Sequence, residues 1–234
     1  MTKHLTPSDL TAIEAAVRQA EARTKGEIYC VVAEQSGHYG ETPLAWAAGV
    51  ALLAPAILLL AGLHVTVPDL FGGWSADQVG AVAEASARRA LVGAIVLQAV
   101  LFAVIAVVVA LRPVRLALTP NSVKRHEVQR RAREVFQSKN LDQTRERTGL
   151  LIFVSLAERM AELIADEGIA QHVEPHIWDR AMTALADGLK RGDPGAGFAA
   201  AVAICGDLLA ERFPADPNDN PDQLPDAVVI LPRV

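Results

Sequence analysis

The chain has 234 residues, of which 51% are hydrophobic and 5% aromatic, and it carries a formal net charge of −5 at pH 7. That length accommodates one large domain or two small ones. The negative balance, with basic residues gathered beside an apolar run instead of over a folded face, argues against nucleic-acid binding.

The N-terminus and the two cysteines narrow the cellular setting. Charges occur throughout the first 40 residues and no apolar run of signal-peptide length is present, so we expect no secretory signal peptide. Cys30 falls in a predicted strand and Cys205 in a predicted amphipathic helix. We expect both to be buried, reduced thiols that pack as small hydrophobic groups. A disulfide between them is the alternative.

The first predicted helix begins with a recognisable capping sequence. Thr6 suits the N-cap, Pro7 suits the first helical position, and Asp9 completes a capping-box pattern. We expect this helix to end at Gly26, where a glycine can adopt the positive φ of a C-cap. Residues 27–33 (EIYCVVA) then predict a strand. The apolar positions of the helix fall on one face; they are Leu10, Ile13, Val17 and Ala20.

Two long runs, 44–63 and 91–111, contain no charged residue. Each is long enough to cross the hydrocarbon core of a bilayer, about 30 Å, as a helix. Pro55 lies inside the first run, where membrane helices tolerate a kink. Since Gln98 is the one strongly polar side chain in either run, we expect an anchor and not a transport path. Two buried helices of a soluble protein are the alternative.

Charges beside these runs predict the orientation. Residues 112–133 contain seven basic residues and one acid, whereas the loop 64–89 contains three acids and two arginines, Arg88 and Arg89. By the positive-inside rule, the C-terminal side is cytoplasmic, and two spans place the N-terminus there as well. Arginine outnumbers lysine in an alanine-rich background, which is typical of GC-rich bacteria. We therefore expect a two-pass protein of the bacterial inner membrane, with both termini inside.

Basic residues that follow the second run have two interpretations. They contact anionic lipid headgroups, each contributing about 1 kcal/mol near the surface, or they only enforce the topology. Membrane lipids are thus the expected non-protein partner. The residues that we expect at the headgroups are Arg112, Arg115, Lys124 and Arg125.

The centre of the predicted fold is a pair of strands within residues 147–166. Gly149 opens a five-residue apolar run that suits a strand buried on both faces. A short polar turn then leads to a weaker strand at 160–165. Before this ribbon, a second Leu-Thr-Pro at 118–120 predicts a helix that begins as the first one does.

The C-terminal part predicts two amphipathic helices, one starting at Pro175 and one after the segment 191–195. The apolar run 227–231 predicts an edge strand. Strand 27–33 is too small to fold alone, and its natural partner is the run that Gly149 opens. We therefore expect one discontinuous domain, 1–38 with 118–234, into which a membrane hairpin, 39–117, is inserted at little cost in loop entropy.

The order of four segments resembles the TPM-domain family, and the resemblance covers the chain outside residues 36–117. It implies a small α/β/α sandwich, in which helices flank a sheet of three or four strands on both sides. The most similar subgroup consists of bacterial membrane proteins whose TPM domain is interrupted by two spans after its first strand. The segments are AEARTKGEIYCVV, LDQTRERTGLLIFVSLAERMAELIADEGI, HIWDRAMTALADGLKRGDPGAGFAAAVAICGDLLAERFP and NPDQLPDAVVIL.

The resemblance also implies several functions. Some members resemble photosystem II repair factors, one animal member is similar to a receptor auxiliary subunit, and the domain carries the label of a phosphatase. Some members bind calcium through acidic residues near the sheet. Many members have a signal peptide and lie outside the membrane, whereas this chain is expected to face the cytoplasm.

Five acidic residues are candidates for a metal or ligand site. They lie at or just past predicted strand ends, or in the loop that enters the central strand, and open α/β sheets bind ligands at strand ends. Converging carboxylates would suit Ca²⁺ or Mg²⁺. Alternatively, they are solvated turn acids that pair with Arg145, Arg147 or Arg159. The five candidates are Glu34, Asp142, Glu158, Asp166 and Glu167.

Three functions follow from these features. The leading hypothesis is a membrane-anchored interaction or assembly module with a membrane-protein partner, because no convergent catalytic set is visible. A metal-dependent phosphatase that uses the strand-end acids is the first alternative, although the sequence has no Walker A, Cys-x5-Arg or Asp-x-Asp pattern. An accessory subunit of an envelope or transport complex is the second alternative.

Overall fold

The computed structural model describes residues 5–61, 79–173, 175–216 and 224–233. The chain forms two compact units. One, here called the sheet unit, combines Met1–His38 with Pro120–Val234, and the other, the helical unit, is Tyr39–Thr119. We describe each unit by itself.

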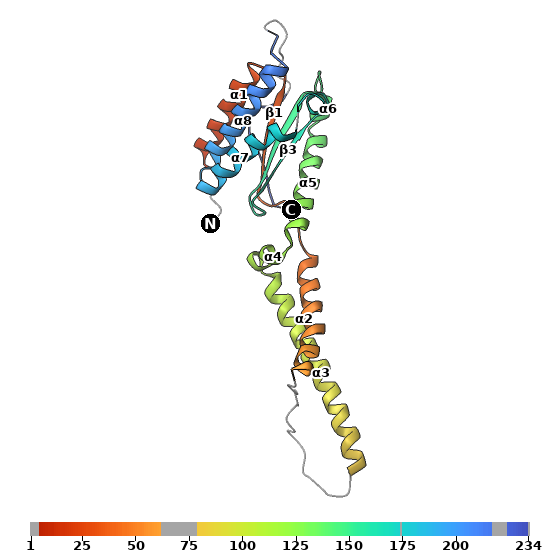
Figure 1. Cartoon of the computed structure of the whole chain (residues 1–234). Helices are drawn as coiled ribbons and strands as arrows, with labels where there is room; N and C mark the ends of the chain where they lie inside the picture. Colours follow the sequence, from red (N-terminus) through yellow and green to blue (C-terminus); the bar gives the residue numbers. More distant parts are fainter. Residues whose placement is uncertain (1–4, 62–78, 174, 217–223, 234) are drawn as a thin grey trace. The chain divides into compact units, whose positions relative to one another are not determined.

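The sheet unit is built around a four-stranded sheet with the order β3-β2-β1-β4 (Figure 1). β1 (Glu27–Ala33) is parallel to both β2 (Gly149–Ser155) and β4 (Val229–Leu231), and β3 (Met160–Ala165) returns antiparallel beside β2. The predicted pairing of the first strand with the Gly149 run is confirmed. The predicted two-strand ribbon and the C-terminal edge strand are confirmed as well.

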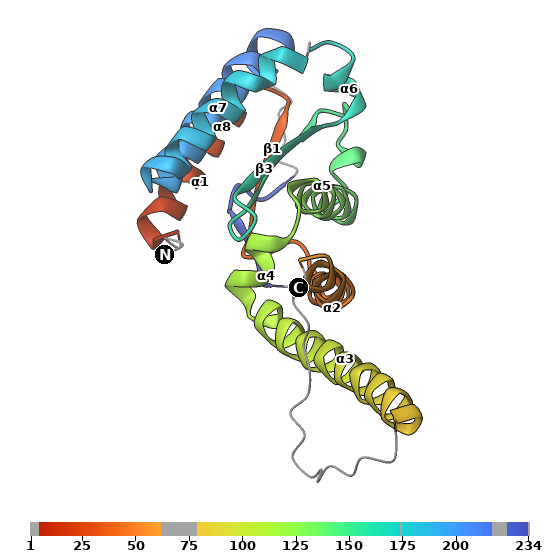
Figure 2. The same cartoon turned by 60° about the horizontal axis from the view of Figure 1, so that its bottom comes forward.

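Helices cover both faces of this sheet. Figure 2 shows α1 (Pro7–Glu21), α7 (Pro175–Arg191) and α8 (Pro194–Arg212) together on one side and α5 (Asn121–Ser138) on the other. Alternate side chains of β1 enter the two cores: Ile28, Cys30 and Val32 pack with the three-helix layer, and Tyr29, Val31 and Ala33 pack with α5. Because both faces are covered, every residue of β1 and β2 is buried. The predicted α/β/α sandwich is confirmed.

The capping prediction for α1 is confirmed at its start and wrong at its end. The Thr6 N–H donates to Asp9 Oδ2 at 2.7 Å, and the Asp9 N–H donates to Thr6 Oγ1 at 3.2 Å. However, the helix ends at Glu21, and Gly26 does not have a positive φ. A Cβ at Gly26 would lie 3.0 Å from Leu209 Cδ1, so a tertiary contact with α8, not a cap, suits glycine there.

The second Leu-Thr-Pro does not start a helix as the first one does. Pro120 is the N-cap of α5, and no side chain caps that helix. The Thr119 hydroxyl instead donates to the carbonyl of Arg115 at 2.7 Å. Thr119 is thus the C-cap of α4 (Arg112–Leu118), a short helix that the sequence did not predict. Two further short helices were also not predicted, η1 (Leu141–Gln143) and α6 (Glu167–Ala170).

In the helical unit, α2 (Glu41–Leu60) lies beside α3 (Val79–Ala110) (Figure 1), and α4 follows. Two helices among the described residues are long and apolar enough to cross a membrane: the Leu91–Ala110 part of α3, and α8 of the sheet unit. In α2 the apolar helix Glu41–Ile57 is shorter. The predicted first span, 44–63, ends at residues outside the described part of the chain.

Candidate functional site

The five candidate acids divide between opposite ends of the sheet. β3 is antiparallel to β2, so Glu158, in the turn between them, lies at the carboxyl end of β1 and β2. Glu34 follows β1 at that same end. Asp166 and Glu167 follow β3 and therefore lie beside the start of β2, and Asp142 lies in η1, which precedes β2. The five residues thus form no single group.

Glu158 holds the chain that leaves β1. Its Oε1 accepts the backbone N–H groups of Ser36, at 3.1 Å, and Gly37, at 3.2 Å. The Ser155 hydroxyl donates to Oε2, and the Ser36 hydroxyl donates to Ser155 Oγ at 2.7 Å. Ser36, Ser155 and Glu158 are all buried. This carboxylate is therefore engaged in a structural contact between the β2–β3 turn and the segment after β1.

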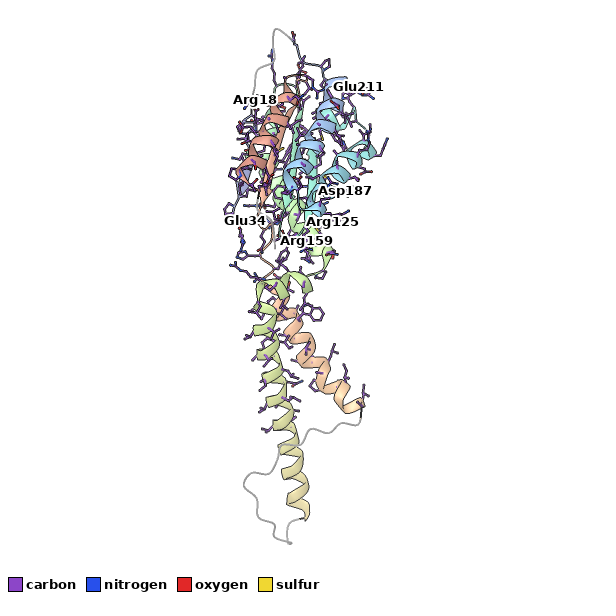
Figure 3. All side chains as sticks on the ribbon, turned by 90° about the vertical axis from the view of Figure 1, so that its left-hand side faces the viewer. Arg18, Glu34, Arg125, Arg159, Asp187 and Glu211 are labelled. Atoms are coloured by element: carbon purple, nitrogen blue, oxygen red, sulfur yellow. The ribbon has the colours of Figure 1, made fainter. Side chains whose placement is uncertain are left out.

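Glu34, at the same end, is partly exposed and pairs with Arg233, whose Nε lies 2.6 Å from Glu34 Oε2. The pair ties the end of β1 to the residues that follow β4. Figure 3 shows Glu34, Arg125 and Arg159 toward one end of the sheet unit and Arg18 and Glu211 toward the other. The carboxyl end of the sheet therefore presents charges of both signs.

Asp166 caps a helix at the opposite end. Its Oδ1 accepts the Glu167 N–H at 2.6 Å, at the start of α6, and lies 3.4 Å from Arg147 Nη2. Glu167 Oε2 lies 3.3 Å from Arg147 Nη1. Two candidate acids therefore pair with one of the arginines that the alternative interpretation named. Oδ2 of Asp166 is buried, as is Oδ1 of Asp142, and neither atom has a hydrogen-bond partner in the described part of the chain.

Metal ligands do not cluster in the described residues. No three His, Cys, Asp or Glu side chains there come together so that they could hold a metal ion. A Ca²⁺ or Mg²⁺ site at the five acids stays a prediction. The four expected headgroup residues divide as well, with Arg112 and Arg115 in α4 of the helical unit and Lys124 and Arg125 in α5 of the sheet unit.

Sequence reasoning missed an acid cluster formed by Glu21, Glu27 and Asp226. Glu21 Oε1 accepts the Ile28 N–H at 2.7 Å, and Glu27 Oε2 accepts the Leu224 N–H at 3.2 Å. Asp226 Oδ2 lies 3.1 Å from Arg18 Nε. The cluster therefore links the end of α1 and the start of β1 to the C-terminal segment.

The pKa of Glu21 is raised to about 9. Burial is the largest cause, and a hydrogen bond with Asp226 and the nearby charge of Glu27 act in the same direction, against the lowering effect of the Ile28 N–H. Glu21 is therefore protonated at neutral pH. A signal for its burial was present in the sequence. Glu21 follows the buried Val17 by four residues, which places both on the same face of the helix.

The two cysteines are free and buried, which confirms the predicted reduced thiols. Burial raises the pKa of the Cys30 thiol, and it raises the pKa of the Cys205 thiol to about 12. Both groups are therefore protonated at neutral pH and pack as apolar side chains.

Comparisons with known proteins agree with this architecture. Residues 113–208 match the family model of the TPM domain. Among solved structures, the chain is similar to the NMR structure of the BA42 protein from the psychrophilic bacterium Bizionia argentinensis, with a TM-score of 0.54 and 18% sequence identity over 98% of this chain and 97% of that one. At this identity the likeness shows the fold alone. A comparison with curated proteins gave no match.

The matched segment contains α5, β2, β3 and α7 but neither α1 nor β1, which precede the helical unit in sequence. The structure supplies these missing parts, because β1 lies between β2 and β4 and α1 packs on α8. The chain therefore carries a TPM domain, whose sheet is completed by residues on the N-terminal side of the helical unit.

Proposed function

We propose that this protein is a membrane-anchored TPM-domain module of the bacterial inner membrane that acts as an interaction or assembly factor, with the helical unit as its anchor. The observation that carries the proposal is the surface of α3. Its segment Leu91–Ala110 has a mean hydropathy of 2.9 and is only 11% buried. In water that large apolar surface would be exposed to solvent, whereas in a bilayer it contacts the hydrocarbon of the lipids.

The exposed apolar side chains of α2 and α3 support the same proposal. An amphipathic helix of a soluble protein exposes polar residues on the side that faces water. Here large apolar residues are exposed along both helices, and they include Leu44, Leu52, Leu53, Ile57, Leu60, Leu91, Val92, Ile95, Val96, Val100, Val104, Val107 and Val108. The basic residues after α3 favour an orientation with both termini in the cytoplasm.

An interaction role is favoured over catalysis because two candidate acids are already engaged in structural contacts. Glu158 accepts hydrogen bonds from three groups in its surroundings, and Asp166 caps α6. The two thiols are buried and protonated, so neither is an accessible nucleophile. The sheet unit then serves as a folded surface that presents charged residues to a membrane-protein partner.

The anchor is tested by washing membranes with alkaline carbonate after expression of the full chain. We expect the wild-type protein to stay in the membrane fraction. Val104 lies within the apolar segment and is 52% exposed. Val104→Arg should reduce retention, because arginine at the centre of a span costs about 2.5–3.5 kcal/mol, whereas Val104→Leu should not. Release of the wild-type chain by the wash would overturn the proposal.

The interaction role is tested by cross-linking in native membranes followed by purification. We expect a defined partner that is captured by the wild-type chain. An assay of phosphate-ester hydrolysis on the same sample distinguishes the interaction role from the enzyme alternative. Turnover that is abolished by a chelator and by Asp166→Asn would replace the proposed role with that of a metal-dependent phosphatase. Capture of a whole transport complex through the hairpin would favour the accessory-subunit alternative.

A further inference from the structure

At the junction of α3 and α4, the helical unit has a polar end that differs in structure from the long apolar helices. α3 ends at Ala110, and Leu111 adopts an extended conformation, with φ −62° and ψ 125°, as the N-cap of α4. Pro113 lies in the first turn of α4, where proline is well tolerated, and it could not continue the hydrogen bonding of α3. The chain therefore breaks between the two helices.

Two hydrogen bonds hold the end of α4 against the start of α2, and a third lies within α4. The Trp46 indole Nε1–H donates to the Leu118 carbonyl at 3.3 Å. The Thr119 hydroxyl donates to the Arg115 carbonyl, so the Thr42 hydroxyl donates to Thr119 Oγ1, at 3.1 Å. These contacts make α4 a fixed part of the helical unit. We call Thr42, Trp46, Arg112, Arg115 and Thr119 the collar.

The collar has the chemistry of a membrane–water boundary. Trp46 is 45% exposed, and its one polar group is already bonded to the backbone, so it combines an open apolar ring with a satisfied N–H. Tryptophan is enriched at the boundary for this reason. The exposed apolar surface begins next to the collar, with Leu44 in α2 and Leu111 between α3 and α4.

The positive charge of the collar is not balanced within its own unit. Neither Arg112 nor Arg115 forms an ion pair with the described residues, and Nε of Arg115 is buried there without a hydrogen-bond partner. Glu41 is the one carboxylate among the side chains that are described in this unit. Two guanidinium groups beside an exposed apolar surface complement a phosphate group at the edge of a bilayer.

We propose that the collar binds the headgroups of anionic phospholipids and sets the depth at which the helical unit lies in the membrane. The inference rests on the proposed function, because it requires the helical unit to be in a bilayer. It separates the basic residues by role: Arg112 and Arg115 bind phosphate, and the other basic residues of the chain are not needed for this binding.

The depth is tested by fluorescence quenching of the full chain in bilayers that contain lipids brominated at different depths. The chain has three tryptophans, so the difference between the wild type and Trp46→Phe isolates the signal of Trp46. We expect the shallowest bromines to quench Trp46 most strongly. Strongest quenching by bromines near the centre of the bilayer would overturn the inference.

The lipid preference is tested by native mass spectrometry of the full chain with phosphatidylglycerol or phosphatidylcholine. We expect the wild type to prefer phosphatidylglycerol by about thirtyfold, from two basic residues that each contribute about 1 kcal/mol near the surface. Arg112→Gln with Arg115→Gln should remove most of this preference. The matched control, Arg191→Gln with Arg212→Gln, removes two exposed charges at the ends of α7 and α8 and should leave it unchanged.

Two outcomes contradict the inference: equal binding of the two lipids by the wild type, or an equal loss of preference in the control. Circular dichroism of each variant establishes that its helices are intact. If the wild type resists the carbonate wash but shows no preference, the collar inference fails and the anchor proposal stands. If the wild type is washed off, both fail.

Discussion

α3 and α8 are both long and apolar enough to cross a membrane, yet only one of them is covered by protein. The Leu91–Ala110 segment of α3 has a mean hydropathy of 2.9 and is 11% buried, whereas α8 has a mean hydropathy of 1.3 and is 50% buried. α8 packs against α1 and α7 in the core of the sheet unit. Length and composition therefore do not distinguish an anchor from a core helix.

Small residues at close contacts distinguish the two helices better. In α8, a Cβ on Gly197 would lie 3.0 Å from the Cα of Gly188 in α7, and a Cβ on Gly206 would lie 2.5 Å from the Cβ of Ala20 in α1. These glycines allow the helices to approach closely. In α2, by contrast, a Cβ on Gly49 would meet nothing within 4 Å. The apolar residues of α8 have partners in the chain, whereas many large apolar residues of α2 and α3 are exposed.

The largest expected difference between the helices comes from removing a phenylalanine. Phe198 of α8 is completely buried, so Phe198→Ala should lower the free energy of unfolding of the sheet unit by about 3–5 kcal/mol. Phe102 of α3 is 38% exposed, and Phe102→Ala should leave the free energy of unfolding of the sheet unit unchanged. Urea unfolding of the full chain in detergent, followed by circular dichroism, measures both. Similar losses of stability in the two variants would contradict the conclusion that α8 is packed in a core and α3 is not.

A smaller effect is expected from adding one methyl group to a glycine. Gly206→Ala places its Cβ against Ala20 and should destabilise the sheet unit by about 1–3 kcal/mol through overpacking. Gly49→Ala meets open space in the middle of a helix, where alanine is favoured over glycine by about 0.5–1 kcal/mol. Thermal unfolding of both variants gives the comparison. If Gly206→Ala did not change the stability, α1 and α8 would be able to move apart without destabilising the sheet unit.

Glu21→Gln, in the layer that α1 shares with α8, should change the free energy of unfolding least of all at mildly acidic pH. This change should grow as the pH rises. The pKa of Glu21 is raised from 4.5 to about 9, so the folded chain holds one more proton than the unfolded chain between these values. The stability that Glu21 contributes is therefore complete below about pH 4.5 and is lost as the pH rises to about 9. The substitution removes this dependence, because a glutamine side chain does not titrate.

At pH 5, Glu21→Gln should change the stability by no more than about 1 kcal/mol, because the amide can replace the hydrogen bonds. Toward pH 9 the variant should become progressively more stable than the wild type. Asp207→Asn is the control, because Asp207 lies in an exposed ion pair with Arg23. Parallel pH profiles of the wild type and Glu21→Gln, measured by thermal unfolding, would contradict the raised pKa.

Elements whose causes are local could be predicted from the amino-acid sequence. Thr6, Pro7 and Asp9 lie within one turn, so their capping interactions did not depend on the rest of the fold. The run opened by Gly149 is apolar throughout, which required a strand covered on both faces. The same reasoning placed the start of α7 at Pro175 and found the strand near the C-terminus.

The sequence also predicted the pairing of β1 with β2, but other contacts between residues far apart in the chain became visible only in the tertiary structure. Gly26 contacts Leu209, the acids at the strand ends divide because β3 runs antiparallel to β2, and Glu21 meets Asp226 only when the C-terminal segment pairs with β1. Spacing along a sequence reports which face of an element a side chain lies on, but not which element that face meets. That choice depends on packing, which joins residues through space.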